Sequence, residues 1–192
     1  MSKHSLWKGA VAGSVAGLAG TLAMTQFQNL WSQASKKMKA KRNPGSSSTM
    51  RSLESQDMES QAQEPQGPES QSEDATMKAA GKLAAIGGRT LTHEQKKKLG
   101  PVVHYAFGSG MGKVYGMIME TGPRNLRRHD LLTGIGLGSM LFVGADEIAV
   151  PALGLSRKAS ASPMSSHLYA LASHLVYGVT TAAVWKAVRA AL

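Results

Sequence analysis

Four apolar runs, each long enough to cross a lipid bilayer, constrain this sequence more than any other feature. They cover residues 9–35, 101–119, 131–155 and 159–185. The first and last runs contain no charged residue, the second is interrupted only by Lys113, and the third only by Asp146 and Glu147. A helix crosses the hydrocarbon core with about 20 mostly apolar residues. The sequence therefore predicts an all-α integral membrane bundle of four transmembrane helices.

A long polar loop separates the first two runs. We assign residues 1–35 to helix 1, residues 36–100 to the loop and residues 101–192 to helices 2–4. Within the loop, residues 43–74 are rich in Ser, Gln, Glu and Pro and nearly free of branched apolar side chains. Such a segment cannot bury enough surface to offset the entropy lost on ordering, so we expect a disordered acidic linker.

Residues 75–99 predict two surface helices that lead into helix 2. In the first, residues 75–86, an apolar side is expected to carry Met77, Leu83 and Ile86. Lys78 and Lys82 lie on another side, and Gly87-Gly88 is expected to end the helix.

The second surface helix is expected to be a short basic turn. Thr92 with Gln95 three residues later predicts a capping box at its start. We expect Gly100-Pro101 to close it before helix 2 begins.

The net charge of +10 comes from Lys and Arg in short clusters beside the apolar runs. This placement is typical of contacts with anionic lipid headgroups, so the bilayer is the expected partner. No nucleic-acid-binding motif is present, and we expect no nucleic-acid partner. The absence of Cys excludes disulfides and thiolate metal sites. Because no nucleophile elbow, phosphate loop or nucleotide fingerprint occurs, we expect neither an enzyme nor a bound cofactor.

Glycines recur every fourth residue in three of the four runs. They are Gly9, Gly13 and Gly17; Gly108, Gly112 and Gly116; and Gly134 and Gly138. Small residues at this spacing form a flat stripe on which another helix can pack closely. The partner could belong to the same chain, to a second copy in a homo-oligomer or to another membrane protein.

Two tripeptides suggest an internal repeat. Val114-Tyr115-Gly116 recurs as Val176-Tyr177-Gly178, and each follows a histidine near the start of its run. Two repeated helical hairpins would explain the recurrence.

Several short stretches resemble the YagU-like family of small bacterial inner-membrane proteins, whose function is not assigned. They are Val-His-Tyr-Ala-Phe-Gly at 103–108, Tyr-Gly at 115–116, Gly-Ala-Asp-Glu-Ile-Ala-Val-Pro at 144–151 and His-Leu-Val-Tyr-Gly at 174–178. The resemblance covers the four runs but not the acidic linker. It implies a bacterial inner-membrane location and supplies no catalytic residues.

Besides Lys113, five His, Asp and Glu side chains lie inside the apolar runs, where an ionisable group costs about 2.5–3.5 kcal/mol on insertion scales. They are His104, Asp146, Glu147, His167 and His174. In a four-helix topology they fall at similar depth, in the half of the bundle nearest the long loop.

Three roles for these five residues remain open. They could bridge helices as buried polar groups, handle protons or cations, or bind a metal of unknown identity. We therefore expect a small multi-pass membrane protein with a structural or scaffold-like role. The alternative is a proton- or cation-handling protein that uses the His/Asp/Glu cluster.

Overall fold

The computed structural model describes residues 5–42, 73–156 and 163–192, and every regular element in these ranges is helical. The elements are α1 (Leu6–Arg42), α3 (Ala75–Ile86), α4 (His93–Thr121), α5 (Arg124–Arg128), α6 (Asp130–Leu141), the π-helix η1 (Phe142–Ala149), α7 (Val150–Ala152) and α8 (Met164–Ala191). The all-α prediction is confirmed for the described residues.

Most of the predicted acidic linker, residues 43–72, lies outside the described residues. Its last two residues, however, are part of the fold. Asp74 caps α3, because its carboxylate accepts a hydrogen bond from Met77 N at 2.8 Å. Glu73 contacts Lys96 at 2.9 Å. The predicted linker boundary at residue 74 was therefore wrong by two residues.

Three of the described helical stretches are long and apolar enough to cross a membrane. They are Leu6–Met38, Asp130–Ala152 and Met164–Ala191. The chain thus has the helices of a membrane protein. α4, which contains the predicted second span, is not among them, and its sequence includes the charged residues Lys113 and Glu120.

The predicted stop at Gly100-Pro101 was wrong, because α4 continues through both residues. The predicted capping box is confirmed: Gln95 N donates to the Thr92 hydroxyl and Thr92 N donates to the Gln95 side chain. Proline removes one backbone donor but does not forbid a helix that neighbouring packing stabilises. Here α3 supplies that packing, since a Cβ on Gly100 would lie 3.1 Å from Met77 Cγ. The second surface helix is therefore the beginning of α4.

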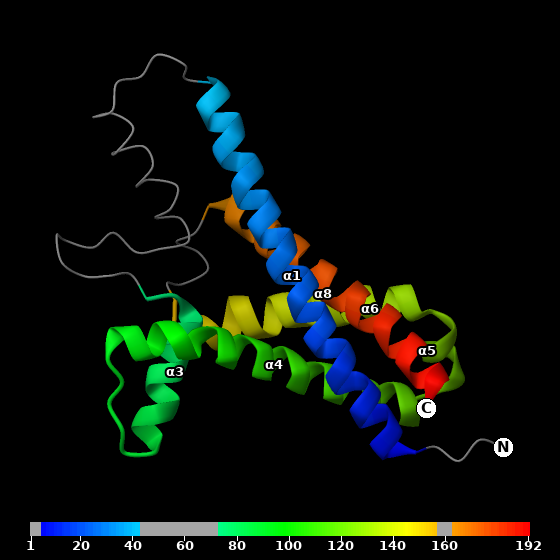
Figure 1. Cartoon of the computed structure of the whole chain (residues 1–192). Coiled ribbons are helices and arrows are strands. Elements are labelled where there is room, and N and C mark those ends of the chain that lie inside the picture. The colour runs from blue at the N-terminus through cyan, green and yellow to red at the C-terminus, as the bar shows by residue number, and fades with distance from the viewer. Residues whose placement is uncertain (1–4, 43–72, 157–162) are drawn as a thin grey trace, which may run out of the picture.

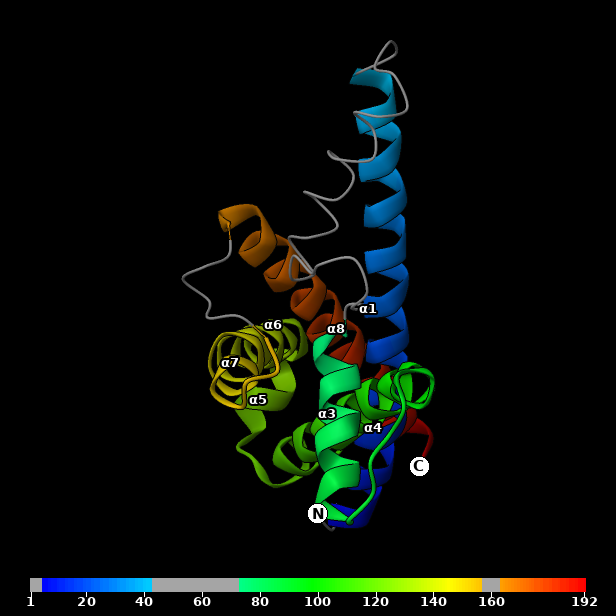
Figure 2. The same ribbon diagram turned by 90° about the vertical axis from the view of Figure 1, so that its left-hand side faces the viewer.

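The long helices form two crossing layers. α4 and the stretch from α6 to α7 lie roughly along a common line but run in opposite directions, and α1 and α8 pass across them (Figure 1 and Figure 2). α1 packs against α4 and α8, and α8 also packs against α6. The C-terminal part of α1 extends beyond the other helices (Figure 1).

Glycines from both helices meet where α1 crosses α4. A Cβ on Gly13 would lie 2.2 Å from the carbonyl oxygen of Gly112, and one on Gly17 would lie 2.3 Å from that of Gly108. A Cβ on Gly116 would lie 2.1 Å from Gly9 O. Since real Cβ atoms do not approach backbone this closely, only glycine permits this crossing. The partner of the first glycine stripe thus lies within the same chain.

The crossing of α6 and α8 repeats the same arrangement. A Cβ on Gly178 would lie 2.1 Å from Gly134 O and 3.0 Å from Gly138 Cα. The matching distances from Gly116 are 2.1 Å to Gly9 O and 2.8 Å to Gly13 Cα. Gly178 therefore occupies in the second hairpin the position that Gly116 occupies in the first, as two repeated hairpins require.

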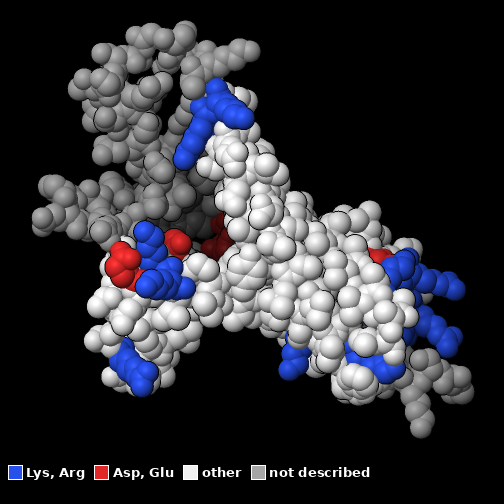
Figure 3. Space-filling view, in the orientation of Figure 1, with Lys and Arg blue, Asp and Glu red and all other residues white. Residues whose placement is uncertain are grey.

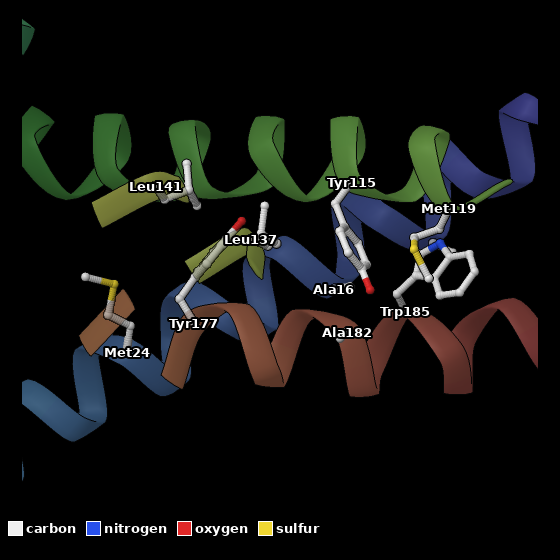
Figure 4. Packing of buried hydrophobic residues seen from close by; sticks show 10 residues of the cluster. Ala16, Met24, Tyr115, Met119, Leu137, Leu141, Tyr177, Ala182 and Trp185 are labelled. Carbon is white, nitrogen blue, oxygen red and sulfur yellow. The ribbon is translucent and has the colours of Figure 1, made fainter. Parts of the chain in front are cut away.

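Aromatic side chains fill the space between the two crossings. Tyr115 of α4 meets Trp185 of α8 edge to face, with ring centroids 6.0 Å apart. Tyr177 of α8 reaches toward α4 (Figure 4) and donates its hydroxyl to Gly108 O at 2.6 Å. These contacts join the two hairpins, and the Tyr177 hydroxyl is buried with a hydrogen-bond partner, as a membrane interior requires.

Gly112→Ala tests the first crossing. The added Cβ would overlap Gly13 O and Gly17 Cα, which lie 2.3 and 2.5 Å from its ideal position, so α1 and α4 must separate. We expect a loss of about 1–3 kcal/mol in the free energy of unfolding, measured by thermal or denaturant unfolding in detergent. Gly110→Ala is the matched control, because no heavy atom lies within 4 Å of its added Cβ. Equal stability of the two variants would contradict the packing described here.

Candidate functional site

A π-helical segment carries the two adjacent acids. In η1 the backbone turn is wider than in an α-helix, and at its end Val150 N donates to Ala145 O, five residues back. π-Helical segments are uncommon in proteins, and many of those that occur lie at functional sites. Pro151, which has no N–H donor, follows directly after Val150. The extra residue per turn shifts the direction in which Asp146 and Glu147 face, which a helical wheel drawn on the sequence does not reveal.

Each acid faces a histidine of α8. Glu147 Oε1 lies 2.6 Å from His167 Nδ1, a short hydrogen bond. Asp146 Oδ2 lies 3.6 Å from His174 Nδ1, within ion-pair distance. The same Nδ1 donates to Ala170 O at 2.9 Å, which places the proton of a neutral His174 on that nitrogen.

His104 of α4 approaches the Asp146–His174 pair from the other hairpin. It interacts electrostatically with both residues, although no hydrogen bond joins them. The structure therefore brings together all three helices on which the sequence analysis placed ionisable residues. We call the five residues His104, Asp146, Glu147, His167 and His174 the polar site.

Burial differs within the polar site. The His174 side chain is 10 % exposed, whereas that of Asp146 is 40 % exposed. His167 and Glu147 lie between these values. The site thus runs from a partly open carboxylate to an imidazole packed inside the bundle.

Metal coordination is the least supported of the three roles. Within the ranges that the structure describes, no three His, Cys, Asp or Glu side chains are grouped so that they could hold a metal ion. The site consists of pairs, and a pair supplies too few ligands for the usual protein metal centres.

Another charged pair, which sequence reasoning missed, joins α4 to α8 at the other end of these helices. Glu120 accepts hydrogen bonds from Arg189 Nε at 2.8 Å and Arg189 Nη2 at 2.9 Å, and also from Ser5 N at 3.2 Å. The Glu120 side chain is 3 % exposed. Because the partners are 69 positions apart, only the fold reveals the pair. Lys113, by contrast, lies on an exposed face of α4.

Comparisons of this chain with protein-family models, curated proteins and solved structures found no match. The resemblance to the YagU-like family stays a prediction.

Glu120→Gln should destabilise the bundle, because it leaves the Arg189 guanidinium without its charged partner. We expect a loss near the lower end of the about 3–5 kcal/mol typical of buried pairs, since Arg189 keeps some contact with solvent. Thermal or denaturant unfolding in detergent measures this loss in the free energy of unfolding.

The control for Glu120→Gln is Lys186→Gln, which removes the pair with Asp130. The Lys186 side chain is 69 % exposed, so about 0–1 kcal/mol is expected. A loss from Lys186→Gln as large as that from Glu120→Gln would contradict the structural role assigned to Glu120.

Proposed function

We propose that this protein exchanges protons across a bacterial inner membrane through the polar site. The observation that carries the proposal is the presence of two carboxylate–imidazole pairs, side by side on one π-helical segment. Ionisable groups inside a membrane bundle are costly and usually mark ion or proton pathways.

The chemistry of the pairs suits proton exchange. Glu147 and His167 lie at hydrogen-bond distance, 2.6 Å, so they share one proton that either group can hold, whereas Asp146 and His174 are 3.6 Å apart, within ion-pair distance only. Asp146 and Glu147 are consecutive residues, so a proton that enters at the more exposed Asp146 has a second pair one residue away.

Comparison of the two crossings supports a role beyond helix packing. Gly13 faces the carbonyl of Gly112, and Gly138 faces the carbonyl of His174 at a similar distance, 2.2 against 2.4 Å. His174 therefore occupies the position that glycine fills in the first crossing. Because the first hairpin closes with glycine at this position, close packing does not by itself require a histidine there. A purely structural role for the polar site is the alternative that the first experiment below separates.

We further propose that α4 is a fourth membrane helix and that the long loop is cytoplasmic. The apolar stretch 101–119 supports the first point, since Lys113 can extend its amine toward the interface. The basic cluster at residues 36–42, directly after the first apolar run, supports the second. The YagU-like resemblance supports the bacterial inner membrane as the location.

Proton flux in proteoliposomes tests the proposal. With an imposed pH gradient, an internal pH dye and valinomycin to dissipate charge, the wild-type chain should speed equilibration well above that of empty vesicles. Glu147→Gln and Asp146→Asn should abolish most of this flux, because neither amide releases a proton. Glu94→Gln, an exposed acid at the start of α4, is the matched control and should keep it.

A structural role predicts a different outcome of the same experiment. The wild-type chain would then carry no flux, and Glu147→Gln would lower the unfolding temperature in detergent. That combination would refute the proton-exchange proposal.

Cysteine labelling tests the topology, because the chain has no native Cys. Lys97→Cys and Arg124→Cys place single thiols near the two ends of α4. If α4 crosses the membrane, an impermeant maleimide should label them from opposite sides, Lys97→Cys from the cytoplasmic side. Labelling of both from one side would show that α4 lies along the surface instead.

A further inference from the structure

We propose that α3 and the beginning of α4 form a binding site for the phosphate group of an anionic lipid. The site is a cavity of about 260 Å³ beside Lys78, Lys82 and Lys96. This inference does not depend on proton exchange, since none of its residues belongs to the polar site.

The side chains of α3 point in three directions with different chemistry. Met77 and Ala80 are buried against α4. Leu83 and Ile86, in contrast, are 59 % and 84 % exposed, so the predicted single apolar side of α3 is divided into a buried and an exposed part. Lys78 and Lys82 form the third side. A short helix that exposes large apolar side chains beside lysines is typical of the membrane interface.

Lysines predominate in the described lining of the cavity. Among the described residues that line it, three are lysines and one, Glu73, is an acid. Glu73 already accepts hydrogen bonds from Lys96 at 2.9 and 3.1 Å. Lys82 donates to Leu153 O, a neutral carbonyl, and in the described part of the chain it forms no ion pair. A phosphate could therefore form an ion pair with Lys82 without displacing a carboxylate.

The location of the cavity matches the headgroup level of a bilayer. Its far wall is Gly154, two residues beyond Ala152, where a candidate membrane span ends. Lys82 itself contacts the neighbouring Leu153. Helix ends and phosphate groups occupy the same interfacial layer. On the face shown in Figure 3, Lys and Arg gather mainly toward the ends of the molecule, with a largely uncharged middle.

Two features favour a lipid over a soluble anion. The exposed Leu83 and Ile86 need an apolar environment, which acyl chains supply and water does not. The phosphate of a lipid is also held at this depth by its own chains, whereas inorganic phosphate must be immobilised from solution.

The test measures lipid binding to the full-length chain in detergent. Titration with short-chain phosphatidylglycerol, followed by the rise in unfolding temperature, should give saturable binding, and phosphatidylcholine should bind more weakly. The double variant Lys78→Gln/Lys82→Gln should weaken phosphatidylglycerol binding about tenfold or more, because each lysine contributes to phosphate attraction. Lys97→Gln/Lys98→Gln removes the same charge from the neighbouring run, outside the cavity, and should have little effect.

Two further measurements distinguish the phosphate of a lipid from free inorganic phosphate. Ile86→Ser should weaken phosphatidylglycerol binding, and inorganic phosphate should stabilise the wild-type chain far less than the lipid does. Equal weakening by both lysine double variants would show diffuse attraction and overturn the site. Inorganic phosphate or an oligonucleotide that binds as tightly as the lipid would also overturn it. Unfolding temperatures without lipid verify that each variant is folded.

Discussion

The close approach of helix backbones at two crossings is the constraint on which the rest of the structure depends. In a membrane, apolar side chains gain little by leaving lipid for protein, so helices associate mainly through packing and hydrogen bonds. Glycine on both sides of a crossing brings the backbones into direct contact. A Cβ on Gly116 would lie 2.1 Å from Gly9 O, and one on Gly178 would lie 2.1 Å from Gly134 O, so both crossings leave no room for a larger residue.

The two crossings share a close approach of the helix backbones but differ in their side chains. The polar site lies at the crossing where the side chains are ionisable. The first hairpin has glycine on both helices where Gly13 and Gly17 meet Gly108, Gly112 and Gly116. The second replaces one glycine position with His174 and follows α6 with a π-helix that directs Asp146 and Glu147 toward α8. The close backbone packing is thus repeated, whereas the two carboxylate–imidazole pairs of the polar site lie in the second hairpin.

Charged residues serve three separate purposes in this chain. The buried Glu120 and the partly exposed Arg189 join α4 to α8. The polar site pairs the acids of η1 with imidazoles of α8. The lysines of α3 line an open cavity beside the end of a candidate membrane span. Burial and the type of partner, rather than charge itself, distinguish these roles.

The sequence by itself determined the helices and the way some of them begin. Run length and apolar content predicted the three candidate spans, and Thr92 with Gln95 predicted a capping box that is present, because these signals act within a few residues. The prediction that Gly100-Pro101 ends a helix was wrong, because α4 continues through both residues and α3 packs on Gly100. Only the tertiary structure decided which glycines face each other, that a π-helix carries Asp146 and Glu147, and that Glu120 meets Arg189. These features depend on how helices far apart in the sequence cross, and no local pattern encodes that geometry.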